Sequence, residues 1–174
     1  MSPQMIFQLQ LVLGYVPWLL VLSAYGWPKL RAMDGVAAQR AIATLHSFRF
    51  FGLVFLVPGV VGAGLPARFA SFAAYGDFAT GLLAMLALLT VRVRPLFWAS
   101  VVAFNALGMI DILVDYYHGA QIGLARVAGE LGAAYAIPMI YVPVLMITHV
   151  VAFYLLWRAA TKAGQNVADP AVVY

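Results

Sequence analysis

Five long apolar segments, separated by short polar stretches, dominate the pattern along the chain. About 20 consecutive apolar residues are needed to cross the hydrocarbon core of a bilayer. By that rule we expect spanning helices near residues 5–26, 41–63, 70–91, 95–118 and 136–158. The pattern therefore predicts an all-α, multi-pass transmembrane bundle over residues 1–158, followed by a short cytoplasmic tail, 159–174.

The first apolar segment resembles a signal peptide in position only. The residues before it, MSPQ, carry no positive charge, whereas Lys29, Arg31 and Arg40 follow it. A secretory signal has its cations before the apolar stretch. We therefore expect a retained first helix.

Lysine and arginine are concentrated in alternate connections and so indicate an orientation. They follow the first, third and fifth segments, while the intervening connections hold only Arg68 and Arg126. Cytoplasmic loops carry the excess of cations. This predicts an outside N-terminus and a cytoplasmic C-terminus in a cell inner membrane, and three tryptophans fall at the same inner boundary: Trp27, Trp98 and Trp157.

The composition agrees with a lipid environment and excludes several functions. Of the 174 residues, 65% are hydrophobic and 9% charged, and the mean hydropathy is +0.95. Ten cations are too few for the basic stripe of a nucleic-acid-binding protein. The absence of cysteine excludes disulfides, iron–sulfur clusters and thiolate metal sites. The expected partner is the bilayer, and a homo-oligomer stays open.

The fourth segment contains the residues that are most costly to place in lipid. Asn105, Asp111, Asp115 and His118 interrupt an otherwise apolar run. Asp111, Asp115 and His118 are spaced i, i+4 and i+7, so they share one helical face, which Asn105 flanks. Intramembrane ionisable groups generally face protein or water and mark functional sites. Asp115 and His118, however, lie close enough to the outer boundary to be ordinary residues at the mouth of a site.

Three other segments carry polar residues at similar depth. Counting 1.5 Å per residue from the flanking cations places Arg49, Asn105 and His149 near the midplane. His46 lies one turn further in. Asp77 and Asp111 lie nearer the outer side, within reach of a long side chain, so we predict that Arg49 pairs with at least one of them. The structural alternative is that these residues only hold helices together.

Prolines inside the segments predict bends. Pro17, Pro58, Pro138 and Pro143 each remove a backbone donor and free a carbonyl. A bend at the last two would open space beside His149. The alternative is that proline is simply commoner in membrane helices.

Four short motifs, HSFRFFG, GDFATGLLA, FNALGMID and PVLMITH, resemble those of a set of small bacterial inner-membrane proteins. The shared features are H-x2-R, GD, N-x5-D and a late histidine after paired prolines, across residues 41–157. The resemblance implies a multi-pass membrane protein and supplies no activity, so whether the chain is an enzyme stays open.

Two functions from different classes remain. The first is a cavity that binds or passes protons or a small polar substrate, as in transport. The second is a haem-binding redox protein with His46 and His149 as axial ligands. A zinc or iron site is disfavoured by the separation of the histidines from the aspartates, and a lipid enzyme or a structural assembly is also left open. For the first function the candidate residues are His46, Arg49, Asp77, Asn105, Asp111 and His149, with Asp115 and His118 at the mouth.

Overall fold

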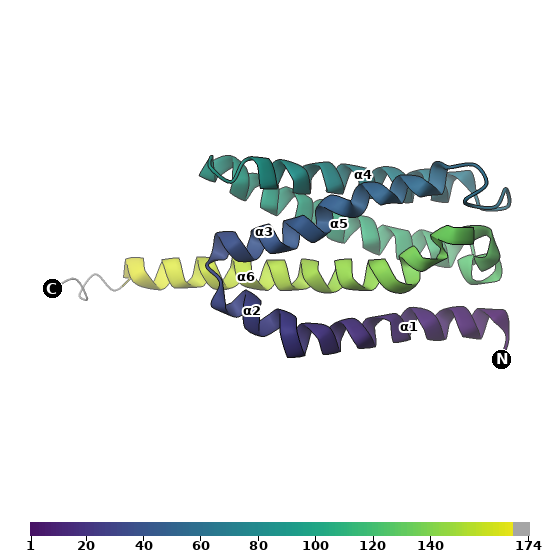
Figure 1. The fold of residues 1–174 in the computed structure, drawn as a ribbon, viewed down its shortest axis with the longest axis horizontal. Coiled ribbons are helices and arrows are strands. Elements are labelled where there is room, and N and C mark those ends of the chain that lie inside the picture. The colour runs from purple at the N-terminus through teal and green to yellow at the C-terminus, as the bar shows by residue number, and fades with distance from the viewer. Residues whose placement is uncertain (169–174) are drawn as a thin grey trace.

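The first apolar segment forms one long helical stretch along the outside of the bundle (Figure 1). The computed structural model describes the backbone of residues 1–168 and the side chains of 1–161. In it, α1 (Pro3–Val21) leads into a π-helical turn, η1 (Leu22–Gly26), and then into α2 (Trp27–Ala32). Pro17 lies inside α1. Residues 169–174, at the end of the expected tail, lie outside the described residues.

The second segment begins earlier and ends earlier than the expected 41–63. It consists of α3 (Gly35–His46), whose N-terminal amides are capped by Asp34, and a 3-10 helix, η2 (Ser47–Leu56). The end of η2 has a local cause. A residue before proline is driven out of the helical region, and Val57, which precedes Pro58, is extended. Pro58 therefore terminates this segment and does not bend it.

Two long helices follow and pack side by side. They are α4 (Ala67–Leu89) and α5 (Arg94–Gln121), joined by a four-residue connection. Pro95 stands in the first turn of α5, where its missing N–H costs nothing. The stretch after α5 forms two 3-10 helices, η3 (Leu124–Arg126) and η4 (Ala128–Tyr135).

The last segment starts with a π-helical turn, η5 (Ile137–Tyr141), and continues as α6 (Val142–Ala168). The π-helical turn lies directly before Pro143. Because proline has no backbone N–H, it cannot donate the helical hydrogen bond to the residue one turn earlier. The indole N–H of Trp18 in α1 donates to the carbonyl of Ile140, 2.8 Å away. Because α6 continues to Ala168, it includes residues that were expected to belong to the tail.

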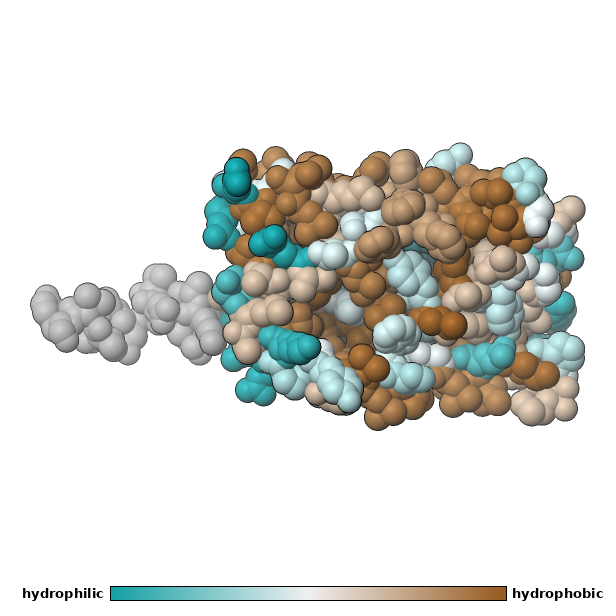
Figure 2. Space-filling model, in the orientation of Figure 1, coloured by the Kyte–Doolittle hydropathy of each residue, from teal (hydrophilic) through white to brown (hydrophobic). Residues whose placement is uncertain are grey.

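Four helical stretches are long and apolar enough to cross a membrane: Pro3–Ala32, Ala67–Leu89, Arg94–Gln121 and Ile137–Thr161. The described residues are otherwise helical or irregular, with one isolated bridge between Pro58 and Val61. Brown, apolar side chains cover most of the body of the molecule in Figure 2, and teal ones gather at the end where α2 meets α3. An apolar surface of this extent is compatible with a membrane environment.

The core is divided along the length of the bundle. One apolar cluster lies toward the N-terminal end of α1 and is centred on Phe55, Phe69 and Leu131. The other lies toward the opposite end and is centred on Phe97 and Phe104. Between them, α3, η2, α4, α5 and α6 contribute a buried polar layer.

Candidate functional site

Arg49 is the centre of the buried polar layer. Its side chain is 0% exposed, although it carries a charge. Nε donates to Oδ1 of Asp77 at 2.7 Å, and Nη2 donates to Oδ2 of Asp111 at 2.6 Å. Nη1 lies 3.3 Å from the carbonyl oxygen of Gly108. The predicted pairing of Arg49 with an aspartate is confirmed, and it involves both candidates.

The pairing follows from where the helices place these residues. Asp77 lies in the middle of α4 and Asp111 in the C-terminal half of α5, so the guanidinium of Arg49 bridges two neighbouring helices from a third element, η2. Both carboxylates are almost fully buried. A buried charge is tolerated only when it is paired and hydrogen-bonded, and this geometry satisfies the arginine.

His149 in α6 connects the arginine to Asn105. Nη1 of Arg49 lies 3.1 Å from Nε2 of His149, and Nδ1 of His149 lies 2.9 Å from Oδ1 of Asn105. The Asn105 amide donates to the carbonyl of Val101 at 2.8 Å, which leaves its oxygen as the acceptor. Because arginine can only donate, these partners assign a neutral His149 with its proton on Nδ1.

His46, the last residue of α3, packs directly on His149. The two ring centroids are 4.0 Å apart. Nε2 of His46 lies 2.9 Å from the hydroxyl of Thr148, and that hydroxyl donates to the carbonyl of Val144. Thr148 is therefore the acceptor, so His46 carries its proton on Nε2 and presents a bare Nδ1.

Two glycines let the helices approach closely enough for these contacts. A Cβ at Gly76 would overlap the carboxylate of Asp111, and a Cβ at Gly108 would overlap both Nη1 of Arg49 and Nε2 of His149. Gly76 is on α4 and Gly108 on α5. The charged groups thus occupy space that any other residue at these positions would fill.

The layer is satisfied unevenly. Among the described side chains, four buried polar atoms have no hydrogen-bond partner: Gln39 Oε1, His46 Nδ1, Asp111 Oδ1 and Asp115 Oδ1. All four are acceptors, because Nδ1 of His46 carries no proton when the proton is on Nε2. Buried polar atoms without partners are rare in proteins and commonly hold ordered water or a ligand. The charges are also unequal, because a single guanidinium faces two carboxylates.

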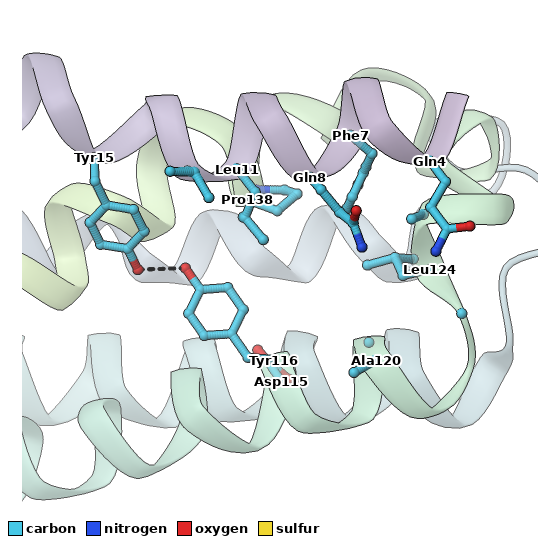
Figure 3. Close-up of a pocket in the computed structure, with 14 residues that line it drawn as sticks. Gln4, Phe7, Gln8, Leu11, Tyr15, Asp115, Tyr116, Ala120, Leu124 and Pro138 are labelled. Atoms are coloured by element: carbon cyan, nitrogen blue, oxygen red, sulfur yellow. Dashed lines mark hydrogen bonds between the residues drawn. The ribbon is translucent and has the colours of Figure 1, made fainter. Parts of the chain in front are cut away.

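A pocket of about 600 Å³ lies beside this layer, between α1 and α5. In Figure 3, Gln8 and Tyr15 project from α1 toward α5, and Asp115 and Tyr116 project back. The hydroxyls of Tyr15 and Tyr116 are 2.7 Å apart. Asp115 lines the pocket.

The central residues do not line this pocket. Arg49, Asn105, Asp111 and His149 are buried and bonded to one another, and the pocket begins one helical turn from Asp111, at Asp115. His118 lies elsewhere. Its ring packs against Phe72 with centroids 4.9 Å apart, and it lines a separate, smaller pocket of about 300 Å³.

The two histidines do not fit a haem. Axial ligands must stand on opposite faces of the macrocycle with the iron between them. Here the rings of His46 and His149 contact each other, and their Nε2 atoms are engaged by Thr148 and Arg49. Within the described residues, no group of three histidine or acidic side chains is placed to hold a metal ion.

Several residues of this region were not predicted from the sequence. Gln39 lies seven residues before His46 on the same face of α3, a helical spacing that could have revealed it. Thr148 adjoins His149 but looks like an ordinary membrane-helix threonine. Tyr15 and Tyr116 lie more than a hundred residues apart, and no local pattern relates them.

The fold and this layer define a class: an all-helical protein, with four helices long and apolar enough to span a membrane, organised around a buried arginine, two aspartates and two histidines. Residues 6–157 match a family model described as "Domain of unknown function (DUF8737)". The chain therefore belongs to this family. No curated protein and no solved structure shows a significant match.

Proposed function

We propose that the protein is a multi-pass membrane protein whose buried polar layer binds protons and relays them along the bundle. The observation that carries the proposal is the imbalance around Arg49. One guanidinium serves two carboxylates, and Oδ1 of Asp111 is left buried without a donor. Uptake of one proton at that oxygen would balance the charge and convert an acceptor without a partner into an O–H donor.

The position of the unpartnered acceptors supports a relay as well as a binding site. Gln39 and His46 lie on α3, toward the end of the bundle that carries α2. Asp111 and Asp115 lie in the C-terminal half of α5, toward the opposite end, where the pocket is. Water or protons held at these four atoms would provide separate polar sites on both sides of Arg49, as a proton relay along the bundle requires.

We further infer five crossings with the N-terminus outside. The 12 residues of α3 and the 10 of η2 make a fifth stretch about 38 Å long at their respective rises, against a hydrocarbon core of about 30 Å. The N-terminus and the C-terminal part of α6 lie at opposite ends of the bundle (Figure 1). The cation-rich connections lie at the same end of the bundle as the C-terminal part of α6, which favours a cytoplasmic C-terminus.

The relay can be tested in liposomes that contain the purified protein and an internal pH-sensitive dye. A potassium gradient with valinomycin drives protons inward, and the rate of acidification is measured. We expect proton entry with the native chain and a loss of at least about tenfold with Asp111→Asn, which keeps the shape of the side chain. His118→Gln, on the same helix but in the separate pocket, should conduct normally.

Equal rates in the native chain, Asp111→Asn and protein-free liposomes would refute the proposal. Each variant must elute as a single species in size-exclusion chromatography, so that a lost signal is not a lost fold. Asp77→Asn provides an independent second variant of the same cluster.

A further inference from the structure

We propose that the pocket between α1 and α5 binds an organic ammonium ion with an apolar body, whose N–H groups donate to the carboxylate of Asp115. This goes beyond the proton relay, because it assigns a ligand class to the pocket that Asp115 lines. The pocket holds a charged acceptor, uncharged polar groups and an apolar wall within one volume (Figure 3). Each of these three features restricts the chemistry of the ligand.

The charge of the site selects a cation with hydrogen-bond donors. Oδ1 of Asp115 is buried and has no partner. Among the described residues, the ion pairs formed by aspartates are those of Asp77 and Asp111 with Arg49, so no protein cation neutralises Asp115. An anionic ligand would be repelled by the carboxylate of Asp115, and a neutral apolar ligand would give that carboxylate no hydrogen-bond donor.

The polar groups that flank Asp115 are neutral. Gln4 and Gln8 of α1 line the pocket with their side-chain amides, and Tyr15 and Tyr116 are joined through their hydroxyls. The aromatic faces of these tyrosines attract an organic cation. A bound ammonium would therefore meet the Asp115 carboxylate, with amide dipoles and aromatic rings around it.

The remainder of the wall is apolar and accounts for the body of the ligand. Phe7, Leu11, Val12, Leu124 and Pro138 line it. About 600 Å³ lies within the range of pockets that hold small organic molecules. A bare inorganic cation would leave most of this apolar surface without contact, so an amine that carries an alkyl or aryl group fits better.

The test is equilibrium dialysis of radiolabelled n-octylamine against the full chain in dodecylmaltoside micelles, which carry no amine. n-Octanol and octanoate serve as isosteric neutral and anionic probes and correct for partition into the micelle. We expect saturable binding of octylamine at least about tenfold tighter than that of either control, as one charge-assisted hydrogen bond provides.

Two variants test the site independently. Asp115→Asn keeps the shape and removes the charge, and it should weaken octylamine binding at least about tenfold. Ala120→Leu fills the pocket from an exposed position on its wall and should weaken binding without touching Asp115. His118→Gln, in the neighbouring pocket, should bind as the native chain does.

Equal binding of octanol and octylamine, or binding that survives both pocket variants, would overturn the proposal. The source of the amine is then separated by competition. Displacement of octylamine by phosphatidylethanolamine but not by phosphatidylglycerol identifies a lipid headgroup, and the absence of displacement identifies a free amine. No proton gradient is applied, so this result is independent of the relay.

Discussion

Replacing Arg49 with methionine removes the one positive charge of the buried layer while keeping a long, flexible side chain. The substitution deletes two charge-assisted bonds to Asp77 and Asp111 and the contacts to Gly108 and His149. Each charge-assisted bond is worth about 1.5–3 kcal/mol. Removing one partner of a buried ion pair costs about 3–5 kcal/mol, because the other charge is left without compensation. We expect a loss of about 3–5 kcal/mol in the free energy of unfolding.

The assay is unfolding in mixed micelles by titration with sodium dodecyl sulfate, followed by circular dichroism. Arg68→Met, at an exposed position at the start of α4, is the matched control and should change the free energy by less than about 0.5 kcal/mol. Combining Arg49→Met with Asp77→Asn and Asp111→Asn should recover part of the loss, because amides need no counter-charge. A cost below about 1 kcal/mol for Arg49→Met alone would refute the buried ion-pair cluster.

Gly108→Ala should destabilise the protein by about 1–3 kcal/mol in the same titration, because its methyl group would overlap Arg49 and His149; an unchanged midpoint would mean that the helices are further apart. Gln39→Leu removes the unpartnered acceptor that lies nearest to α2, and it should slow proton entry into liposomes. Its effect on the free energy of unfolding should be small, because only one hydrogen bond, to the carbonyl of Ala152, is lost. Proton entry at the native rate would exclude Gln39 from the relay. A reporter that is active only in the cytoplasm should give signal when fused to the C-terminus, and activity of a periplasmic reporter there instead would overturn the orientation.

The central ion pair could be predicted because lipid makes it unavoidable. An arginine at mid-depth in an apolar segment must find a carboxylate, and two aspartates lay within one side-chain length. The all-helical class followed in the same way from segment length. These inferences depend on the cost of a group in hydrocarbon, which a sequence reveals directly.

The end of the second segment was predicted wrongly for a local reason. Hydropathy continues past Leu56, but Pro58 forces Val57 out of the helical region, and the helix stops there. Apolar character alone does not tell a helix from an apolar turn. The 3-10 form of η2 could likewise not be read from the residues.

The pocket and the unpartnered acceptors depend on tertiary geometry. The expected cavity around Arg49 instead contains a bonded network, because Gly76 and Gly108 bring α4, α5 and α6 close together. The pocket forms one turn away, where α1 covers Asp115. No periodicity within one helix encodes the distance between two helices, so this part of the site required the structure.

The cluster around Arg49 should hold one exchangeable proton on Asp111. Infrared spectroscopy of the purified protein in water and in heavy water tests it most directly, because a protonated carboxyl has a carbonyl stretch distinct from that of a carboxylate. We predict such a band in the native chain, shifted in heavy water and missing from Asp111→Asn. A native spectrum without that band, or one in which Asp111→Asn leaves it unchanged, would contradict the account.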